Sequence, residues 1–250
     1  MGPVVAESSL ENPSLVLSDR VFGGEGLAIF QDTDGRRSEG RSAPRGSCAF
    51  MPGSWIIDIR HLTEHDPDFE MPSRMLKRRD FYGHVIRAAT ATSDSMFLSV
   101  IPCRRRPGRV ACPGLLCVAK TNLPEPFIFW ECVTCDDNGR ISGFRNSWYD
   151  LSKSVPPERP PNDTLVALGV TFEEHASWIS GDLISYDQES LVLIYSARVS
   201  GRQVRVCGDD DEMVTLLEAT AADTNHETKR PRRERLRAIL RKLEKTLALK

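Results

Sequence analysis

Apolar and polar positions divide the chain into a polar leader followed by a segment of mixed strand and helix character. Residues 1–50 hold only short apolar runs between many glycine, serine, proline and charged residues, which is typical of a flexible leader. The run Ser54–Ile59 predicts a strand, and the apolar positions of Arg74–Thr90 recur at helical spacing. Residues 51–152 are therefore predicted to be an α+β unit in which a helix flanks short strands.

A proline-rich stretch separates this unit from a second one. Four prolines fall within residues 153–161 and predict an extended, semi-rigid linker. Beyond it, Thr171 and Glu174 have the capping-box spacing that begins a helix. The runs Leu191–Val199 and Gln203–Cys207 flank a Ser-Gly pair and predict a β-hairpin.

Two further helices are predicted at the end of the chain. The acids of Asp209–Glu212 suit the first turn of one helix, which is expected to end near His226. The other covers about Pro231–Leu249, and its apolar residues form one stripe, made of Leu236, Ile239, Leu240, Leu243 and Leu247. Residues 162–250 are thus predicted to form a helix, a hairpin and two helices, of which the last is basic.

Composition narrows the class of protein. The 250 residues are 40% hydrophobic and 27% charged, with a formal net charge of -2, which fits a water-soluble protein with a modest core. No run of eighteen apolar residues occurs, and Met1–Leu10 lacks the basic and apolar regions of a secretory signal. We therefore expect an α+β protein of the cytoplasm with no membrane span.

The cysteines carry the strongest chemical signal, because five of the seven fall in the stretch from Cys103 to Cys135. Cys132 and Cys135 are separated by two residues and followed by an Asn-Gly turn, an arrangement typical of a zinc knuckle. Thiolates favour Zn²⁺, and a structural zinc site needs four ligands. In a protein without export features, such a cluster favours a metal over disulfides.

Two more ligands must come from Cys103, Cys112 and Cys117. Cys112 is followed by Pro-Gly and an apolar run, and the same order of cysteine, glycine and strand follows Cys135. This parallel favours Cys103, Cys112, Cys132 and Cys135 as the ligands of one structural Zn²⁺ per chain, with Cys117 in place of Cys103 as the alternative. A site of four cysteines leaves no open position, so the metal is not expected to catalyse a reaction.

Several stretches of the chain resemble a set of uncharacterised bacterial proteins with a zinc-ribbon-like centre. The likeness is carried by Cys103-Arg-Arg-Arg-Pro-Gly108, Cys112-Pro-Gly114, Trp130-Glu-Cys132-Val-Thr-Cys135 and Gly139-Arg-Ile-Ser-Gly143. It spans about residues 50–250, and it departs from the group's pattern at Asp136 and Phe144, where the group has Gly and Trp. The resemblance implies a zinc-ribbon-like β unit and no particular reaction.

Two basic segments stand out against the acidic remainder of the chain. The first lies between two of the candidate ligands and contains Arg104, Arg105, Arg106 and Arg109. The second is Thr228–Lys250, which holds ten Lys and Arg, among them Arg232, Arg233 and Arg237. Concentrated positive charge of this kind suits contact with nucleic-acid phosphates. The leading hypothesis is therefore a non-enzymatic, zinc-stabilised accessory or regulatory protein that contacts nucleic acid.

Two other functions compete with this hypothesis. The first is a protein-interaction module, antitoxin-like or partner-regulating, in which the leucine stripe of the last helix forms the interface. The second is a metallohydrolase, because His61, Glu64 and His65 match the H-x-x-E-H motif. Asp-Pro follows this motif directly and leaves little room for the helix that the chemistry requires. Of the other histidines, His84 is expected to be packed or superficial and His175 to be exposed.

Overall fold

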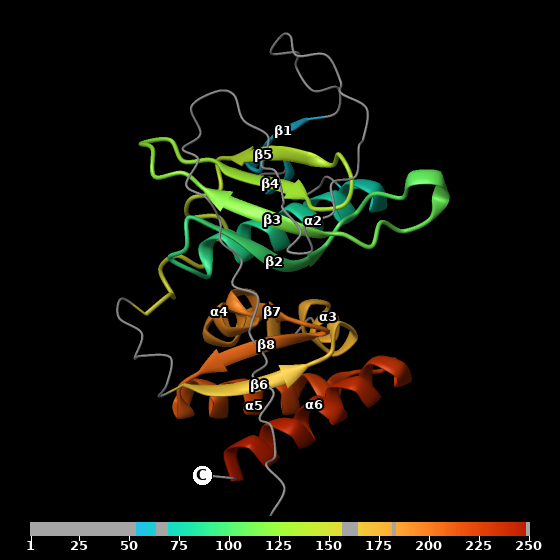
Figure 1. Cartoon of the computed structure of the whole chain (residues 1–250), viewed down its shortest axis with the longest axis vertical. Helices are drawn as coiled ribbons and strands as arrows, with labels where there is room; N and C mark the ends of the chain where they lie inside the picture. The colour runs from blue at the N-terminus through green and yellow to red at the C-terminus, as the bar shows by residue number, and fades with distance from the viewer. Residues whose placement is uncertain (1–53, 64–69, 157–164, 182–183, 249–250) are drawn as a thin grey trace, which may run out of the picture. The chain divides into compact units, whose positions relative to one another are not determined.

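The structure, a computed structural model, describes residues 54–63, 70–156, 165–181 and 184–248 (Figure 1). Within these residues it contains six α-helices and eight strands, and the strands form two sheets. The first sheet has five strands of mixed direction, and the second has three antiparallel strands. The predicted α+β class is confirmed.

The first sheet is an antiparallel meander of four strands to which a fifth is added in parallel. The strand order is β1-β5-β4-β3-β2, and only the β1–β5 pair is parallel. The five strands are β1 (Trp55–Asp58), β2 (Met96–Pro102), β3 (Leu115–Lys120), β4 (Ile128–Cys132) and β5 (Asn138–Ser142). The strand predicted for Ser54–Ile59 is therefore present, and so are the short strands expected within residues 51–152.

One face of this sheet is apolar and packs on helix α2 (Ser73–Thr90). Val118 and Trp130 are buried partners on neighbouring strands, as are Leu116 and Cys132, so all four point to the same face. The ring of Tyr82 on α2 lies 5.6 Å from that of Trp130, which fixes the helix on this face. The short helix α1 (Arg60–Thr63) follows β1.

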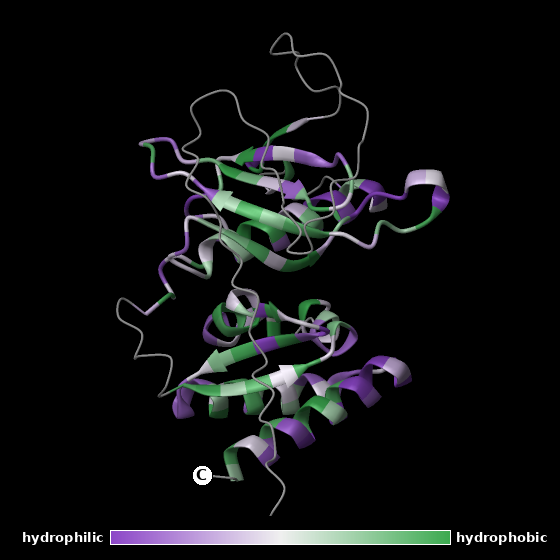
Figure 2. Cartoon of the chain, viewed as in Figure 1, coloured by the Kyte–Doolittle hydropathy of each residue, from purple (hydrophilic) through white to green (hydrophobic). Residues whose placement is uncertain are grey.

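The second sheet has the order β6-β8-β7 and is surrounded by the remaining helices. Its elements are β6 (Val166–Val170), α3 (Phe172–Ile179), α4 (Gln188–Ser196), β7 (Arg198–Ser200), β8 (Gln203–Gly208), α5 (Asp210–His226) and α6 (Arg230–Ala248). Both predicted helix starts are confirmed, because Thr171 with Glu174 and Asp209 with Glu212 form complete capping boxes. Figure 2 shows hydrophobic and hydrophilic residues alternating along α6, as its stripe predicts.

One predicted element of this part is wrong. The run Leu191–Val199 was expected to be a strand, but residues Gln188–Ser196 form helix α4 and only Arg198–Ser200 is a strand. Leu191 to Tyr195 are all buried, so the helix has apolar neighbours on every side and shows no helical periodicity. A short run that is apolar throughout does not distinguish a buried helix from a buried strand.

Strands β2 and β6 have no counterpart among the predicted elements. The predicted turn between β7 and β8 is present, and Gly201 supplies its left-handed residue at φ 59°.

The leader 1–50 lies outside the described residues, as do residues 157–161 of the predicted linker. Residues 153–155 of that linker lie in a turn and bend, where the Ser154 hydroxyl donates a hydrogen bond to the Gln188 side chain at 2.6 Å.

Buried residues of both sheets belong to one apolar cluster, which runs from Ile59 to Leu243. Polar contacts also join the two sheets. Arg198 on β7 pairs with Asp94 at 2.5 Å and lies over the ring of Phe97 on β2. The Nδ1 of His84 on α2 lies 2.6 Å from the Tyr195 hydroxyl on α4.

Candidate metal centre

The meander brings two cysteine-bearing loops to the same end of the first sheet. Residues 103–114 connect β2 to β3, and residues 133–137 connect β4 to β5. Because neighbouring strands of a meander alternate in direction, the first and third connections lie at the same end of the strands. Cys103 and Cys112 lie on the first loop, and Cys132 and Cys135 border the second.

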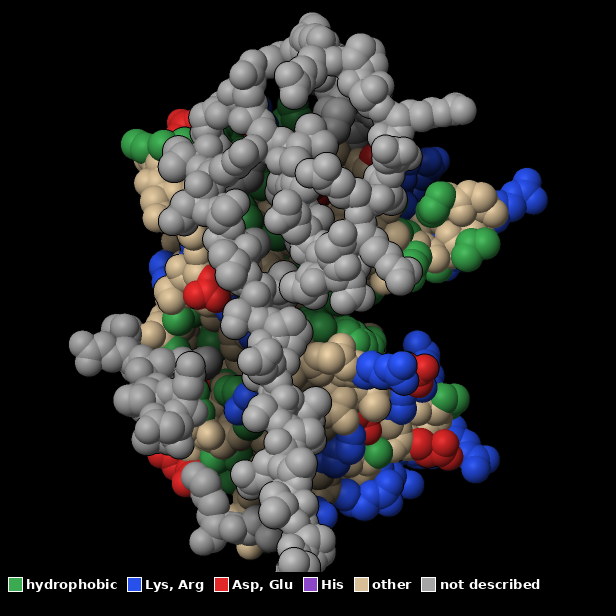
Figure 3. All heavy atoms as spheres, in the orientation of Figure 1, with side chains coloured by type: hydrophobic (Ala, Val, Ile, Leu, Met, Phe, Trp, Pro, Cys, Tyr) green, Lys and Arg blue, Asp and Glu red, His purple; other side chains and the backbone are tan. Residues whose placement is uncertain are grey.

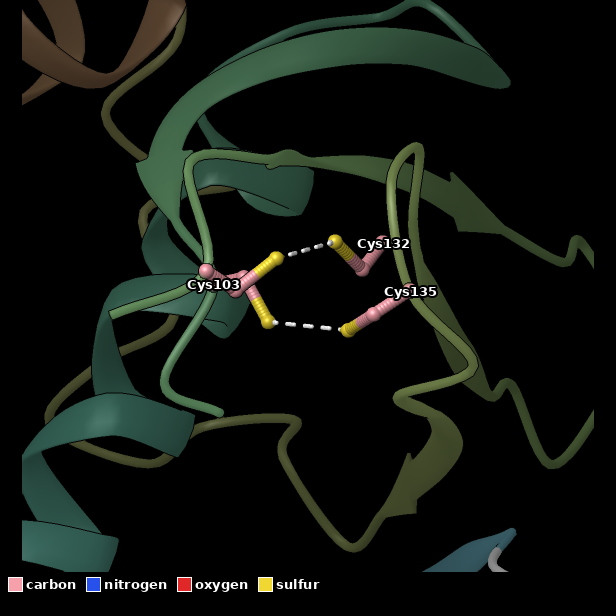
Figure 4. Close-up of side chains that lie close together, drawn as sticks. Cys103, Cys132 and Cys135 are labelled. Carbon is pink, nitrogen blue, oxygen red and sulfur yellow. Dashed lines mark hydrogen bonds between the residues drawn. The ribbon is translucent and has the colours of Figure 1, made fainter. Parts of the chain in front are cut away.

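The four thiols converge at this edge. The sulfurs of Cys103, Cys112, Cys132 and Cys135 all lie within 4.8 Å of one another. The Cys103 and Cys135 sulfurs are 3.6 Å apart, and those of Cys112 and Cys132 are 3.7 Å apart. Figure 4 shows the thiols of Cys103 and Cys135 facing each other across the gap between the loops.

These separations suit four ligands of one ion. A tetrahedral ion with metal–sulfur bonds of about 2.3 Å places its sulfurs about 3.8 Å apart. A disulfide would need a separation of about 2.05 Å, and the cluster's cysteines are free thiols. The arrangement of the four cysteines is therefore compatible with a metal site.

Backbone amides point at the sulfurs in a repeated pattern. The amides of Arg105, Gly114 and Thr134 donate to the sulfurs two residues before them, namely those of Cys103, Cys112 and Cys132, each at 3.4 Å. The amide of Asp137 does the same for Cys135. Hydrogen bonds of this kind stabilise a thiolate over a thiol, so the loops are built to hold negative charge on sulfur.

The pKa values of the thiols reflect the competition between burial and these amides. Burial raises the pKa of Cys103, and the neighbouring thiols raise it further. Burial also acts on Cys132, but the amides of Thr134 and Cys135 outweigh it and lower the pKa of this thiol. Burial raises the pKa of Cys135. The free energy needed to deprotonate a thiol therefore differs between these cysteines. A bound cation would lower it at every sulfur.

The remaining cysteines are placed apart from the cluster. Cys117 pairs with Glu131 and Leu98 across the strands, and both of these residues are exposed, so its thiol lies on the face opposite α2. Cys117 thus does not take the place of Cys103. Cys207 lies on β8 in the second sheet, and Cys48 is outside the described residues.

Gly114 gives the two loops room to approach each other. A Cβ on Gly114 would lie 2.5 Å from the Cys132 sulfur and 2.6 Å from the Thr134 hydroxyl. Its carbonyl accepts a hydrogen bond from the amide of Cys103 at 2.8 Å. The glycine noted after Cys112 in the sequence is therefore required by close packing between the two loops.

Arg104 does not face solvent, in contrast to the expectation for the basic loop. Its side chain is 18% exposed, and its guanidinium lies over the rings of Trp55, Phe81 and Tyr82 at 4.8 to 5.2 Å. It donates to the Tyr82 hydroxyl at 2.9 Å and pairs with the fully buried carboxylate of Asp137 at 3.5 Å. Arg104 thus joins the metal loops to β1 and α2, and its charge is not available to a phosphate.

The other three arginines of this loop are exposed. Arg105 pairs with Asp136 at 3.6 Å, and both side chains are well solvated, so the pair is weak and screened by salt. Arg106 and Arg109 form no ion pair within the described part of the chain, and Arg109 adopts a left-handed conformation at φ 70°. These three cations lie between Cys103 and Cys112, whose positions a metal would fix.

The arginines of the C-terminal basic helix also include a buried residue and exposed ones. Arg232 is 12% exposed, forms ion pairs with Asp223 and Glu227, and donates to the Ser177 carbonyl at 3.0 Å. It is therefore a buried structural residue and does not fit its predicted role. Arg237 is exposed and Arg233 is half-buried, and Figure 3 shows Lys and Arg side chains gathered over this part of the molecule.

The leucine stripe of α6 is used inside the chain. Leu236, Ile239 and Leu243 are fully buried, and α6 packs against α3 and α5. Burying three aliphatic side chains stabilises the fold by several kcal/mol, on the order of 1.5–3 each. The interface expected for a protein-interaction module is thus already occupied by the protein's own helices.

Two histidines are held as neutral side chains, of which His175 is buried and His84 is half-buried. His175 was expected to be exposed but is 1% exposed, with its Nε2 2.8 Å from the Ile194 carbonyl. Burial lowers the pKa of His175 to about 4, and it lowers that of His84 to about 4 as well. His61 lies on α1, whereas Glu64 and His65 of the H-x-x-E-H motif lie outside the described residues.

Comparison of the chain with protein-family models, curated proteins and solved structures found no match. The resemblance to zinc-ribbon-like bacterial proteins therefore stays a prediction. Among the described helices, none combines the length and the apolar character that crossing a membrane requires. The function must accordingly be inferred from the geometry of the cysteine cluster and its surroundings.

Proposed function

We propose that Cys103, Cys112, Cys132 and Cys135 bind one structural Zn²⁺. The observation that carries this proposal is the convergence of four thiols at separations that suit a tetrahedral ion. Four sulfur ligands favour Zn²⁺ or an iron–sulfur centre over hard cations. The sulfur separations of 3.6 and 3.7 Å suit a single ion better than a multi-iron cluster, which needs a wider cage, and Zn²⁺ is the single ion that structural sites of four cysteines ordinarily bind.

The zinc would fasten the part of the long loop beyond Arg104, which has little apolar support. Residues 104–111 are exposed or half-buried throughout, so the long loop between β2 and β3 has almost no apolar core of its own. Metal binding would stabilise it by closing it at both ends, at Cys103 and at Cys112. A site filled by four cysteines has no free position for substrate, which supports a non-enzymatic role.

We further propose that this fastened loop contacts nucleic-acid phosphates through Arg105, Arg106 and Arg109. The three exposed cations lie on one short loop, and no acid occurs between residues 95 and 124 of the sequence. Arg237, exposed on α6, and Arg233 beside it are the candidates for a second contact. Arg104 and Arg232 are excluded because their charges are paired within the fold. Contacts of this kind bind the backbone and do not read base sequence.

Metal analysis of the purified protein tests the first proposal. We expect about one zinc per chain, lost in Cys132→Ser together with resistance to thermal unfolding. Cys117→Ser is the matched control, since this thiol lies on the opposite face, and it should retain the metal. A wild-type protein purified under reducing conditions that carries no metal and does not take up added Zn²⁺ would refute the site.

Binding to duplex DNA and RNA at several salt concentrations tests the second proposal. The affinity should fall with salt, with a log–log slope of about 0.9 per phosphate contact on duplex DNA. The triple change of Arg105, Arg106 and Arg109 to Gln should lower both affinity and slope, while zinc content stays unchanged. Equal affinity of the variant and the wild type at low salt would show that the loop is not the contact surface.

A further inference from the structure

A polar cavity of about 700 Å³ lies beside α2, away from the four cysteines. Its walls come from α1, α2, the loop after β5 and the end of α3. The residues that matter for its chemistry are Arg79, Arg87 and His84 on α2, together with Trp148 and Tyr149. The volume is within the range of cavities that hold small organic ligands.

Arg87 is the unusual residue of this cavity. It is 7% exposed, and no carboxylate among the described residues forms an ion pair with it. Its Nε atom is buried without a hydrogen-bond partner. The guanidinium is flanked by the rings of Tyr149 and Tyr195, at 5.3 and 5.9 Å. Cation–π contact offsets only part of the cost of burying a charge, so within the described residues Arg87 lacks the counter-charge that a buried arginine ordinarily has.

The groups around Arg87 favour a negative ligand. Arg79 and its ion-pair partner Asp80, 3.1 Å away, both line the cavity, so an entering anion shares Arg79 with the Asp80 carboxylate and Arg87 is the cation that no carboxylate of the lining pairs with. Burial raises the pKa of Tyr195 to about 12, so its hydroxyl stays protonated and can donate to the Nδ1 of His84, 2.6 Å away. The Nε2–H of His84 is then a further donor, and this histidine lines the cavity too.

Aromatic rings form the outer part of the same cavity. Trp148 is 57% exposed, and its ring packs edge-on against the ring of Tyr186, with 5.9 Å between the ring centres. Tyr186 is also exposed. Tyr149 is held close to α2 because Gly83 leaves room for it: a Cβ there would lie 2.5 Å from the Tyr149 ring. Exposed rings of this kind present flat surfaces on which another ring can stack.

We propose that this cavity binds an organic anion in which a carboxylate or phosphate is attached to a planar ring. The acid group pairs with the guanidinium of Arg87, with Arg79 as the second cation, and the ring lies against Trp148. The planar fork of Arg87 suits two parallel hydrogen bonds to such an acid group. The proposal is independent of the zinc site, since no cysteine of the cluster lines this cavity.

Calorimetry with two pairs of probes tests the proposal on the full-length protein as purified. Each pair compares an anion with an uncharged analogue: AMP with adenosine, and benzoate with benzamide. We expect at least one anion to bind at least about tenfold more tightly than its analogue, the effect of a single charge-assisted contact. A preference for AMP identifies a phosphate ligand, and a preference for benzoate identifies a carboxylate ligand.

Variants then assign the site. Arg87→Lys keeps the charge but loses the fork, and Arg79→Gln removes the more exposed cation; each should weaken binding of the preferred anion. Arg140→Gln, an exposed arginine on β5 outside the cavity, should not. Thermal unfolding shows whether each variant is folded, and Arg79→Gln keeps the test valid if Arg87→Lys is not. Equal binding of both members of each pair, absence of binding by all four probes, or unchanged affinity in the folded variants would overturn the proposal.

Discussion

Arg232 provides the sharpest test of how the C-terminal helix is used. The side chains of Arg232, Asp223 and Glu227 are 12%, 4% and 7% exposed. Arg232 also donates to the carbonyl of Ser177 on α3, so one guanidinium ties α6 to α5 and α3. We predict that Arg232→Met strongly destabilises the fold.

The magnitude follows from what the change leaves behind. Methionine fills much of the same space, so the loss of packing is small. The carboxylate of Asp223 would stay buried without its cation, and removing one partner of a buried pair costs about 3–5 kcal/mol. At about 2–4 °C per kcal/mol for a chain of this size, the melting temperature should fall by roughly 6–20 °C.

Urea unfolding followed by circular dichroism measures this effect. Arg237→Met, on the exposed side of the same helix, is the matched control and should change the free energy of unfolding by less than about 0.5 kcal/mol. Adding Asp223→Asn to Arg232→Met should restore part of the loss, because the unpaired charge disappears. A loss below about 1 kcal/mol in Arg232→Met would refute the reasoning and return Arg232 to the candidates for phosphate contact.

Three further predictions concern single positions. Gly83→Ala should cost about 1–3 kcal/mol of stability, measured by urea unfolding, because its Cβ would overlap the Tyr149 ring. Gly114→Ala should lower zinc affinity at least about tenfold in a competition assay with a chelator, since its Cβ would displace the Cys132 sulfur. His175 stays neutral in the folded protein down to about pH 4, whereas the unfolded chain takes up a proton near pH 6.5. The free energy of unfolding should therefore fall as the pH drops through this window, and His175→Gln should reduce the dependence by about one proton.

The cysteine cluster could be predicted because its signal is local. The two-residue gap between Cys132 and Cys135 and the glycine after Cys112 are both visible in the sequence, and both serve the geometry of the loops. The choice of Cys103 over Cys117 follows from the alternation of side chains along a strand. Cys117 lies between the buried residues Leu116 and Val118, so its side chain points to the opposite face. Once the strand is located, the face on which each of its side chains lies can be predicted from the sequence.

The roles of the arginines could not be predicted in the same way. Arg104 and Arg105 are neighbours in a run of identical residues, yet one is buried among aromatic rings and the other is exposed. The difference depends on Trp55 and Tyr82, which are distant in sequence. Arg232 likewise depends on Asp223 and on α3. Charge runs show where cations are, but tertiary contacts decide which of them reach solvent.

Helix α4 was missed for a related reason. Its central residues Leu191 to Tyr195 are buried on all sides between α2, α5 and β8, so no polar face marks its period. His175, four residues after the N-cap residue Thr171, is expected at the surface because it lies in the first turn of a helix. It is buried because its ring reaches the end of α4 and bonds the Ile194 carbonyl.

The parallel pairing of β1 with β5 has a consequence for the order of assembly. Trp55 lies opposite Gly139, 84 positions later, whereas β2 to β5 pair with their immediate neighbours in the chain. Short-range pairing closes small loops and forms early, while distant pairing is delayed by the entropy of loop closure. During synthesis at about 5–20 residues per second, β1 must wait several seconds for its partner to emerge. The edge strand is thus the last piece added to its sheet, and the residues it covers stay open to chaperones and proteases until then.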